Sequence, residues 1–197
     1  ASSALNVFMG NGNGTFAAPA IVDFGGGAEG AEIVASDLNN DGKMDLAVAQ
    51  YVGNQVNIYL GQGNGTFTNG GTYATGASPQ ELVSADFNND GIPDLVTSDY
   101  NGNSISLLLG RGDGTFTTRV SFATGTNPYN LVATDLNGDG NYDIALANEG
   151  SNYVSVFLGQ GNGTFNIALT LATSGSMNGI TAADFNGDGN LDLVTSG

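Results

Sequence analysis

Four short runs of alternating acidic and amide residues are the part of this sequence whose residue types could do chemistry. The first, Asp37–Leu46, reads DLNNDGKMDL, and the same pattern begins again at Asp86, Asp135 and Asp184. Each run places carboxylate or amide oxygens at positions 1, 3, 5 and 9, with a glycine at position 6 for a sharp turn. Ca²⁺ takes six to eight oxygen ligands from carboxylates, amides and backbone carbonyls. The spacing therefore predicts a Ca²⁺ loop in each run.

The predicted ligands of each loop are four side chains and the backbone carbonyl of position 7. In chain order they are Asp37, Asn39, Asp41, Lys43 and Asp45; Asp86, Asn88, Asp90, Ile92 and Asp94; Asp135, Asn137, Asp139, Asn141 and Asp143; and Asp184, Asn186, Asp188, Asn190 and Asp192. Three carboxylates within nine residues repel one another unless a cation lies among them. We therefore expect four Ca²⁺ ions, about one per repeat.

The composition excludes several other functions. The chain has no histidine and no cysteine, which removes imidazole bases and thiolate nucleophiles. Only three cationic residues stand against nineteen acidic ones, giving a net charge of −16, so we expect neither nucleic-acid binding nor attachment to an anionic membrane. Every close pair of carboxylates lies in a predicted metal loop, and the free acids are few, notably Asp99 and Glu149. We therefore expect no enzyme activity.

The elements that position the loops must repeat as well, because the runs recur every 49 residues. Between the runs, short segments rich in β-branched residues alternate with clusters of Gly, Asn, Asp and Pro. One such set is Glu81–Phe87, Pro93–Thr97, Ser104–Leu109 and Phe116–Ala123. Four short strands in a unit of roughly 45 residues are typical of a propeller blade. The sequence therefore predicts an all-β fold, a β-propeller built from four four-stranded blades.

The repeat arithmetic predicts a single domain over residues 1–197 in which both chain ends share one blade. The C-terminal strands Ile180–Ala183 and Leu191–Thr195 would pair with the N-terminal strands Leu5–Met9 and Phe16–Phe24. This pairing hides two sheet edges. A closed monomer is favoured slightly over an eight-bladed ring made from two chains. The predicted blades are 31–79, 80–128, 129–177, and 178–197 together with 1–30.

A second candidate site lies on the face opposite the metal loops. In a four-stranded blade, the loops between strands 2 and 3 and those between consecutive blades share that face. These loops hold Tyr51, Asp99, Tyr100 and Tyr129. Tyrosine rings stack on sugars, and a carboxylate can accept hydrogen bonds from their hydroxyls. The pattern is compatible with a glycan or protein ligand on this face, but ordinary polar loops are the favoured interpretation because the chain has no tryptophan.

The Asp-x-Asn-x-Asp-Gly-x-x-Asp-Leu pattern on a β-hairpin, repeated near 50 residues, resembles the FG-GAP/VCBS repeats of bacterial and fungal secreted proteins. These repeats are similar to the calcium-binding blades of the integrin α-subunit and of some mushroom lectins. The nearest remnant of the literal Phe-Gly…Gly-Ala-Pro signature is Phe122-Ala123-Thr124-Gly125. Family propellers commonly have seven blades, whereas this chain supplies four.

The resemblance implies a secreted or cell-surface module that is stabilised by Ca²⁺ and serves binding or adhesion without catalysis. Two other functions stay open at this point. The chain could be a scaffold fragment of a larger secreted polysaccharide-degrading enzyme, or a purely structural repeat.

Overall fold

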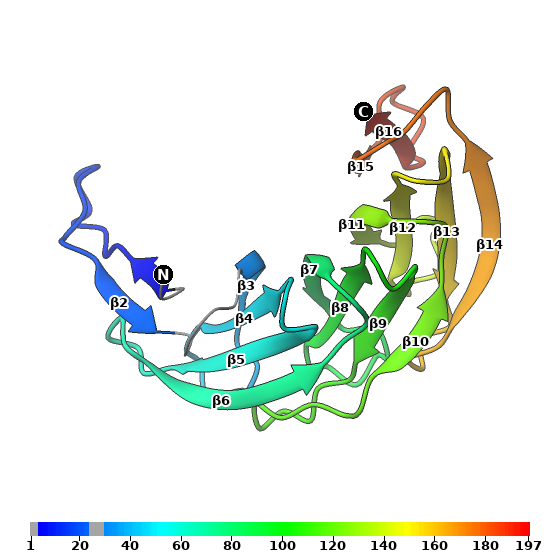
Figure 1. The fold of residues 1–197 in the computed structure, drawn as a ribbon. Helices are drawn as coiled ribbons and strands as arrows, with labels where there is room; N and C mark the ends of the chain where they lie inside the picture. Colours follow the sequence, from blue (N-terminus) through cyan, green and yellow to red (C-terminus); the bar gives the residue numbers. More distant parts are fainter. Residues whose placement is uncertain (1–3, 24–29) are drawn as a thin grey trace.

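A computed structural model describes residues 4–23 and 30–197 of the chain. Within these ranges every regular element is a β-strand, which confirms the prediction of an all-β fold. No helix of the described residues is long and apolar enough to cross a membrane. The strands form a row of small antiparallel sheets along an open crescent (Figure 1).

Three of the sheets have four strands, each strand pairing with the next one along the chain. Sheet A consists of β3 (Gly30–Ser36), β4 (Asp45–Gln50), β5 (Gln55–Gly61) and β6 (Phe67–Ala74). Sheet B consists of β7 (Pro79–Ala85), β8 (Asp94–Asp99), β9 (Ser104–Leu108) and β10 (Val120–Ala123). Sheet C consists of β11 (Pro128–Thr134), β12 (Asp143–Asn148), β13 (Tyr153–Gly159) and β14 (Phe165–Ala172).

The three sheets share one register, as expected for copies of one repeat. Ala47 pairs with Ile58 in sheet A, and Val96 with Leu107 in sheet B. The equivalent pair in sheet C is Ala145 with Val156. This common register lets residues 49 apart be compared directly, since they occupy the same place in successive sheets.

The two chain ends form separate two-stranded sheets. The N-terminal half-sheet is β1 (Ala4–Val7) with β2 (Ala20–Asp23), and the C-terminal half-sheet is β15 (Gly179–Ala183) with β16 (Asp192–Ser196). They lie at opposite ends of the crescent (Figure 1). The predicted pairing of both ends into one closing blade is therefore absent from this structure. The predicted strand end at Phe24 lies outside the described residues.

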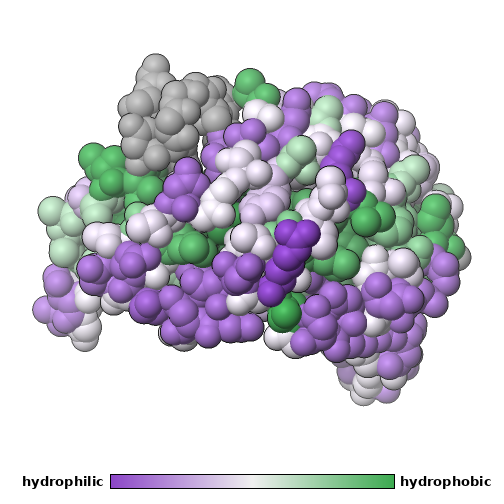
Figure 2. All heavy atoms as spheres, turned by 90° about the horizontal axis from the view of Figure 1, so that it is seen from below, coloured by the Kyte–Doolittle hydropathy of each residue, from purple (hydrophilic) through white to green (hydrophobic). Residues whose placement is uncertain are grey.

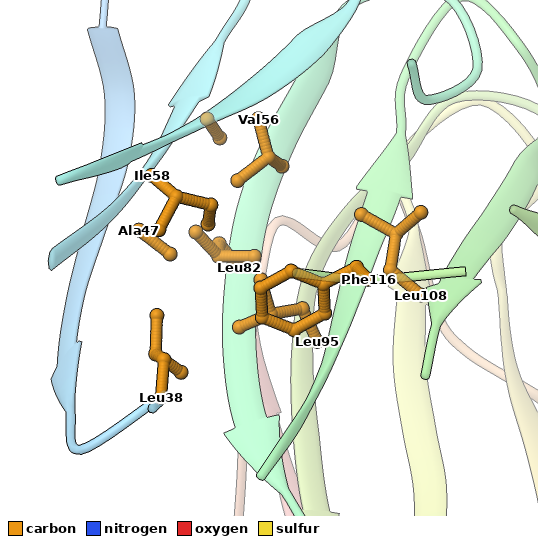
Figure 3. Close-up of a cluster of buried hydrophobic side chains, with 9 residues drawn as sticks. Leu38, Ala47, Val56, Ile58, Leu82, Leu95, Leu108 and Phe116 are labelled. Atoms are coloured by element: carbon orange, nitrogen blue, oxygen red, sulfur yellow. The ribbon is translucent and has the colours of Figure 1, made fainter. Parts of the chain in front are cut away.

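The hydrophobic core lies between neighbouring sheets. Leu38, Ile58, Leu82, Leu95 and Phe116 come together from sheets A and B (Figure 3). A second cluster fills the space between sheets B and C, and a third joins sheet C to the C-terminal half-sheet. Each sheet is therefore held mainly by its neighbours, as is typical of repeat proteins.

The first prediction concerns this inter-sheet core. Ile105 is fully buried between sheets B and C, whereas Val120 in the outer strand β10 is exposed. We expect Ile105→Ala to lower the free energy of unfolding by about 2–5 kcal/mol, because it leaves a cavity among packed side chains. Val120→Ala should change it by less than about 0.5 kcal/mol. Urea unfolding followed by circular dichroism measures both, and equal effects would contradict an inter-sheet core.

Candidate metal loops and ligand face

All four predicted metal loops lie between the first and second strands of their sheets, at one edge of the crescent. They are called loop A (37–45), loop B (86–94), loop C (135–143) and loop D (184–192). The glycine at position 6 has a positive φ in every loop, for example 80° at Gly42. Position 4 also has a positive φ, and it holds Asn40, Asn89, Gly138 or Gly187. The sequence contained this second signal as well, because Asn and Gly tolerate that conformation best.

Inside each loop the side-chain oxygens of positions 1 and 3 accept hydrogen bonds from neighbouring backbone N–H groups. In loop A the Asp41 N–H donates to Asp37 Oδ1 at 3.1 Å and to Asn39 Oδ1 at 3.0 Å. The Gly42 N–H donates to Asp37 Oδ2 at 2.8 Å. Loops B, C and D repeat all three bonds. The loop backbone thus brings the first two predicted side-chain ligands side by side.

The carboxylate at position 9 ties the loop to the sheet. Asp94 is fully buried, and it accepts the N–H of Phe87 at 2.9 Å and that of Gly110 at 2.8 Å. Asp45 and Asp143 are equally buried and make the same pair of bonds. One bond holds position 2 of the loop and the other holds the end of the third strand. This role as a structural tie was not predicted from the sequence.

Electrostatics differ between the start and the end of each loop. Burial raises the pKa of Asp94 to about 6, against the two backbone N–H bonds, and the nearby charges of Asp90 and Asp86 raise it further. Burial likewise raises the pKa of Asp143. The partly exposed first position of loop C behaves in the opposite way, because backbone N–H donors led by that of Gly140 lower the pKa of Asp135. Within loop C, the first carboxyl thus ionises more readily than the buried carboxyl at position 9.

The residues present fit Ca²⁺ in chemical type. Every predicted donor is an oxygen, as Ca²⁺ prefers, and the glycine turn is in place. Within residues 4–23 and 30–197 no three acidic side chains gather closely enough to hold a metal, since those at positions 1 and 5 face backbone N–H groups. The predicted ligand set therefore stays a prediction.

Neighbouring repeats meet at these loops. A Gly-x-Gly-Thr-Phe turn joins the third and fourth strands of each sheet, and it lies on the same edge as the loops. The N–H of Gly114, in this turn of sheet B, donates to the Leu38 carbonyl of loop A at 3.1 Å. The N–H of Gly163 donates likewise to the Phe87 carbonyl of loop B at 3.2 Å. Loops A and B are therefore each packed under the turn of the following sheet.

The opposite edge brings together three of the four predicted ligand residues. The Tyr100 and Tyr129 rings meet edge to face with centroids 6.0 Å apart. The Tyr100 hydroxyl donates to Glu149 Oε2 at 2.7 Å, and this bond is the main cause that raises the pKa of Tyr100. Tyr51 is near enough to influence the same pKa. Glu149, which sequence reasoning left as a free acid, thus joins the tyrosine cluster.

Asp99 does not belong to this exposed cluster. It is fully buried, and its carboxylate accepts the hydroxyls of Thr97, Ser104 and Ser106 at 2.8, 3.0 and 2.6 Å. The expectation that Asp99 faces a ligand is therefore wrong. The equivalent residue of sheet C is Asn148. Its Oδ1 accepts the Gly125 N–H, and its Nδ2 donates to Ser155 Oγ. At this position a buried polar side chain is hydrogen-bonded within the sheet, so its role is structural.

A cleft of about 520 Å³ lies away from both predicted sites, where β2 faces β5 and β6. Its lining includes the side chains of Gln55, Asn57, Tyr59, Phe67 and Thr72. Asn57 Oδ1 accepts hydrogen bonds from Gln55 and Thr72. None of the residues predicted from the sequence lines this cleft.

The geometry describes a repeat protein with a propeller-like fold, in which loops of one type occupy one edge. The sequence matches the family described as FG-GAP-like repeat over residues 1–48, 37–97, 86–146 and 135–195. The chain therefore belongs to the FG-GAP-like repeat family, which confirms the resemblance given by its motifs.

Solved structures share the fold at low sequence identity. A lectin of Agrocybe aegerita, described as specifically recognising non-reducing terminal N-acetylglucosamine, is 21% identical with a TM-score of 0.62, over 96% of this chain and 54% of its own. A Lactobacillus plantarum protein is 15% identical with a TM-score of 0.73, over 97% and 64%. The Pseudomonas aeruginosa periplasmic gluconolactonase is 16% identical with a TM-score of 0.62, over 89% and 45%. No curated protein matches the sequence.

The chain spans about half to two thirds of the length of these structures. They include both a lectin and an enzyme, so the likeness establishes the fold and assigns no activity.

The second prediction concerns Asp99. Burial raises its pKa, against hydrogen bonds led by that of Ser106. The native state therefore favours the protonated form, and this contribution to stability is lost as the pH rises above the unfolded value near 4. We expect the free energy of unfolding of Asp99→Asn, relative to the parent, to increase as the pH is raised from about 4 to 7.

The matched control is Asp113→Asn in the exposed turn of sheet B. Hydrogen bonds from Thr115 lower the pKa of Asp113, so the parent gains stability as the pH rises. The difference should then change in the opposite direction. Denaturant titrations at several pH values measure both variants, and a pH-independent difference for Asp99→Asn would show that its carboxyl is not perturbed.

Proposed function

We propose that this chain is a Ca²⁺-stabilised, non-catalytic binding module of an extracellular protein. The observation that carries the proposal is the division of the crescent into two edges. One edge repeats an oxygen-only loop four times, and the other carries the cluster of Tyr51, Tyr100, Tyr129 and Glu149. The proposal assigns stabilisation to the first edge and ligand binding to the second.

Calcium supplies positive charge at the loops when it binds. The side chains of positions 1, 3, 5 and 9 and the carbonyl of position 7 would hold it, with Asp37, Asn39, Asp41, Lys43 and Asp45 as the set in loop A. Because the turn of the following sheet rests on loops A and B, a cation that orders a loop also supports the contact between sheets. Extracellular modules bind Ca²⁺ at the millimolar levels found outside cells, which favours a secreted or cell-surface location.

The ligand favoured for the tyrosine edge is a carbohydrate. Tyr129 is exposed and held edge to face by Tyr100, so its ring is oriented before a ligand arrives. Glu149 supplies a hydrogen-bond acceptor beside the rings. The fold shared with the Agrocybe aegerita lectin supports this choice without establishing it. A protein ligand on the same edge, a scaffold role in a larger secreted enzyme, and a purely structural role remain the competing functions.

Catalysis is not part of the proposal. The loop carboxylates are bonded to backbone N–H groups, Asp99 is buried, and Glu149 accepts the Tyr100 hydroxyl. The described residues thus leave few carboxylates to act as acid and base. Hydrolysis of a polysaccharide by the purified chain, lost in Glu149→Gln, would overturn this part.

The third prediction tests calcium. At a free concentration of about 100 times the dissociation constant, one site adds about 2.7 kcal/mol, which raises Tm by roughly 5–11 °C for a chain of this size. We expect excess chelator to lower Tm by at least that amount. Asp90→Ala should reduce the number of Ca²⁺ bound by about one and shrink the Ca²⁺-dependent rise in Tm. Differential scanning calorimetry and isothermal titration measure these two quantities.

The control for Asp90→Ala is Asp113→Ala. Both residues are exposed and accept the N–H two positions ahead, from Ile92 and Thr115, but Asp113 lies outside the metal loops. Its removal should leave the Ca²⁺-dependent rise unchanged. A Tm that does not respond to chelator would refute the metal proposal.

The fourth prediction tests the carbohydrate. We expect the chain to bind members of a glycan array, and Tyr129→Ala to weaken binding by roughly tenfold, equivalent to about 1.4 kcal/mol. Tyr142→Ala is the control, since Tyr142 is comparably exposed but lies in loop C. Loss of binding in Asn57→Ala but not in Tyr129→Ala would place the sugar in the cleft beside β2. Binding to no glycan would favour a protein ligand or a structural role.

A further inference from the structure

Two of the chain's three cationic residues, Arg111 and Arg119, line one groove. The groove has a volume of about 460 Å³ and lies where β6 of sheet A meets the segment 109–119 of sheet B, which leads from β9 to β10. It is called the arginine groove, and its lining includes Tyr73, Arg111, Phe116, Thr117 and Arg119. Strands β6 and β10 lie on the convex side of the crescent in Figure 1, and Figure 2 shows that side, where strongly hydrophilic side chains stand beside hydrophobic ones. The groove thus places positive charge at one point of a chain whose net charge is −16.

Neither guanidinium is paired with a carboxylate in the part of the chain that the structure describes. The ion pair found there joins Lys43 to Asp41 in loop A. Arg119 Nη1 donates to Ser106 Oγ at 3.4 Å, and Ser106 Oγ donates in turn to Asp99 Oδ2 at 2.6 Å. Because a guanidinium has five N–H donors, this single long bond orients Arg119 and leaves most of its donors for a ligand.

The other complete sheets show that neither arginine is needed to build this turn. Glutamine takes the place of Arg111 in both, and the Nε2 atoms of Gln62 and Gln160 donate to the carbonyl two positions earlier, at 3.1 and 3.3 Å. The described structure has no such bond from the Arg111 side chain. Small residues take the place of Arg119, namely Gly70 and Ala168. The two charges of sheet B therefore add nothing that the fold of the repeat requires, which points to a ligand.

An aromatic ring lies beside the two cations. Tyr73 of β6 meets Phe116 of sheet B edge to face, with ring centroids 5.3 Å apart. Phe116 is buried and Tyr73 is half-buried, so the Tyr73 ring is held at the groove before a ligand arrives. Aromatic rings stack on sugars, and guanidinium groups bind carboxylates and similar oxyanions through paired N–H donors. The groove offers both kinds of contact.

We infer that the arginine groove binds a sugar that carries a carboxylate or a sulfate group, as a uronic acid or a sulfated sugar does. The sugar ring packs beside Tyr73, and its anionic group accepts hydrogen bonds from Arg111 and Arg119. This site differs from the tyrosine edge in place and in ligand, so it goes beyond the proposed function and does not depend on it. A long polyanion is disfavoured, because the rest of the chain is strongly acidic.

The fifth prediction tests this ligand with three short oligosaccharides of equal length. They are an oligogalacturonate, its methyl ester, and a sulfated galactose oligomer. We expect at least one of the two acidic oligomers to bind and the neutral ester not to, as measured by titration calorimetry at low ionic strength. Binding of only one acidic oligomer would identify the recognised group as carboxylate or as sulfate. Added salt should weaken the binding, because exposed charges are screened.

The matched variants are Arg111→Gln and Arg119→Ala, which copy the residue types that sheet C has at these places. Both should therefore keep the fold, which circular dichroism and Tm check. We expect each to weaken binding of the acidic oligomer by roughly tenfold, because each removes charge-assisted hydrogen bonds. Gln160→Ala, at the equivalent place of sheet C, is the control and should leave the affinity unchanged.

Binding of neither acidic oligomer would overturn the inference, and so would equal affinity for the oligogalacturonate and its ester. Affinities that both arginine variants leave unchanged would overturn it as well. An oligoglutamate that binds as tightly as the acidic sugar would show recognition of the acid without the sugar, against the inference. Loss of binding in Tyr129→Ala but in neither arginine variant would place the acidic sugar at the tyrosine edge, which would support the carbohydrate proposal and refute this one.

Discussion

The buried carboxylate at the ninth position of each loop is the interaction on which the rest of this structure depends. In the complete sheets it accepts one N–H from its own loop and one from the end of the third strand. A buried acceptor of this kind is costly unless it is fully bonded. The loop therefore cannot move without disturbing the sheet, and the sheet cannot lose its third strand without exposing the charge.

This tie explains why the repeats behave as a connected row. Position 2 of the loop, held through its N–H by the carboxylate, offers its carbonyl to the glycine turn of the next sheet. The same residue, Leu38 or Phe87, places its side chain in the core between the two sheets. One residue thus joins loop, core and neighbouring sheet, so stability passes from each repeat to the next.

Much of the fold could be predicted because it repeats. The period of 49 residues and the oxygen pattern predicted strands and loops, since turns and alternation are local properties. Asp99 could not be placed in the same way. Its neighbours in sequence resemble a polar loop, but the hydroxyls that satisfy it come partly from the next strand, at Ser104 and Ser106. The equivalent positions of sheets A and C also hold buried polar side chains, Gln50 and Asn148.

The behaviour of the chain ends was also beyond local reasoning. The arithmetic of the repeats predicted a half-blade at each end, and the described structure has a two-stranded sheet there, but whether two such halves meet is not a local property of the sequence. Neighbouring sheets meet through side chains that are far apart in the sequence, such as Phe116 against Tyr73 and Phe165 against Phe87. How far successive sheets turn depends on such non-local contacts, so the arrangement of the chain ends could not be predicted from the repeat alone.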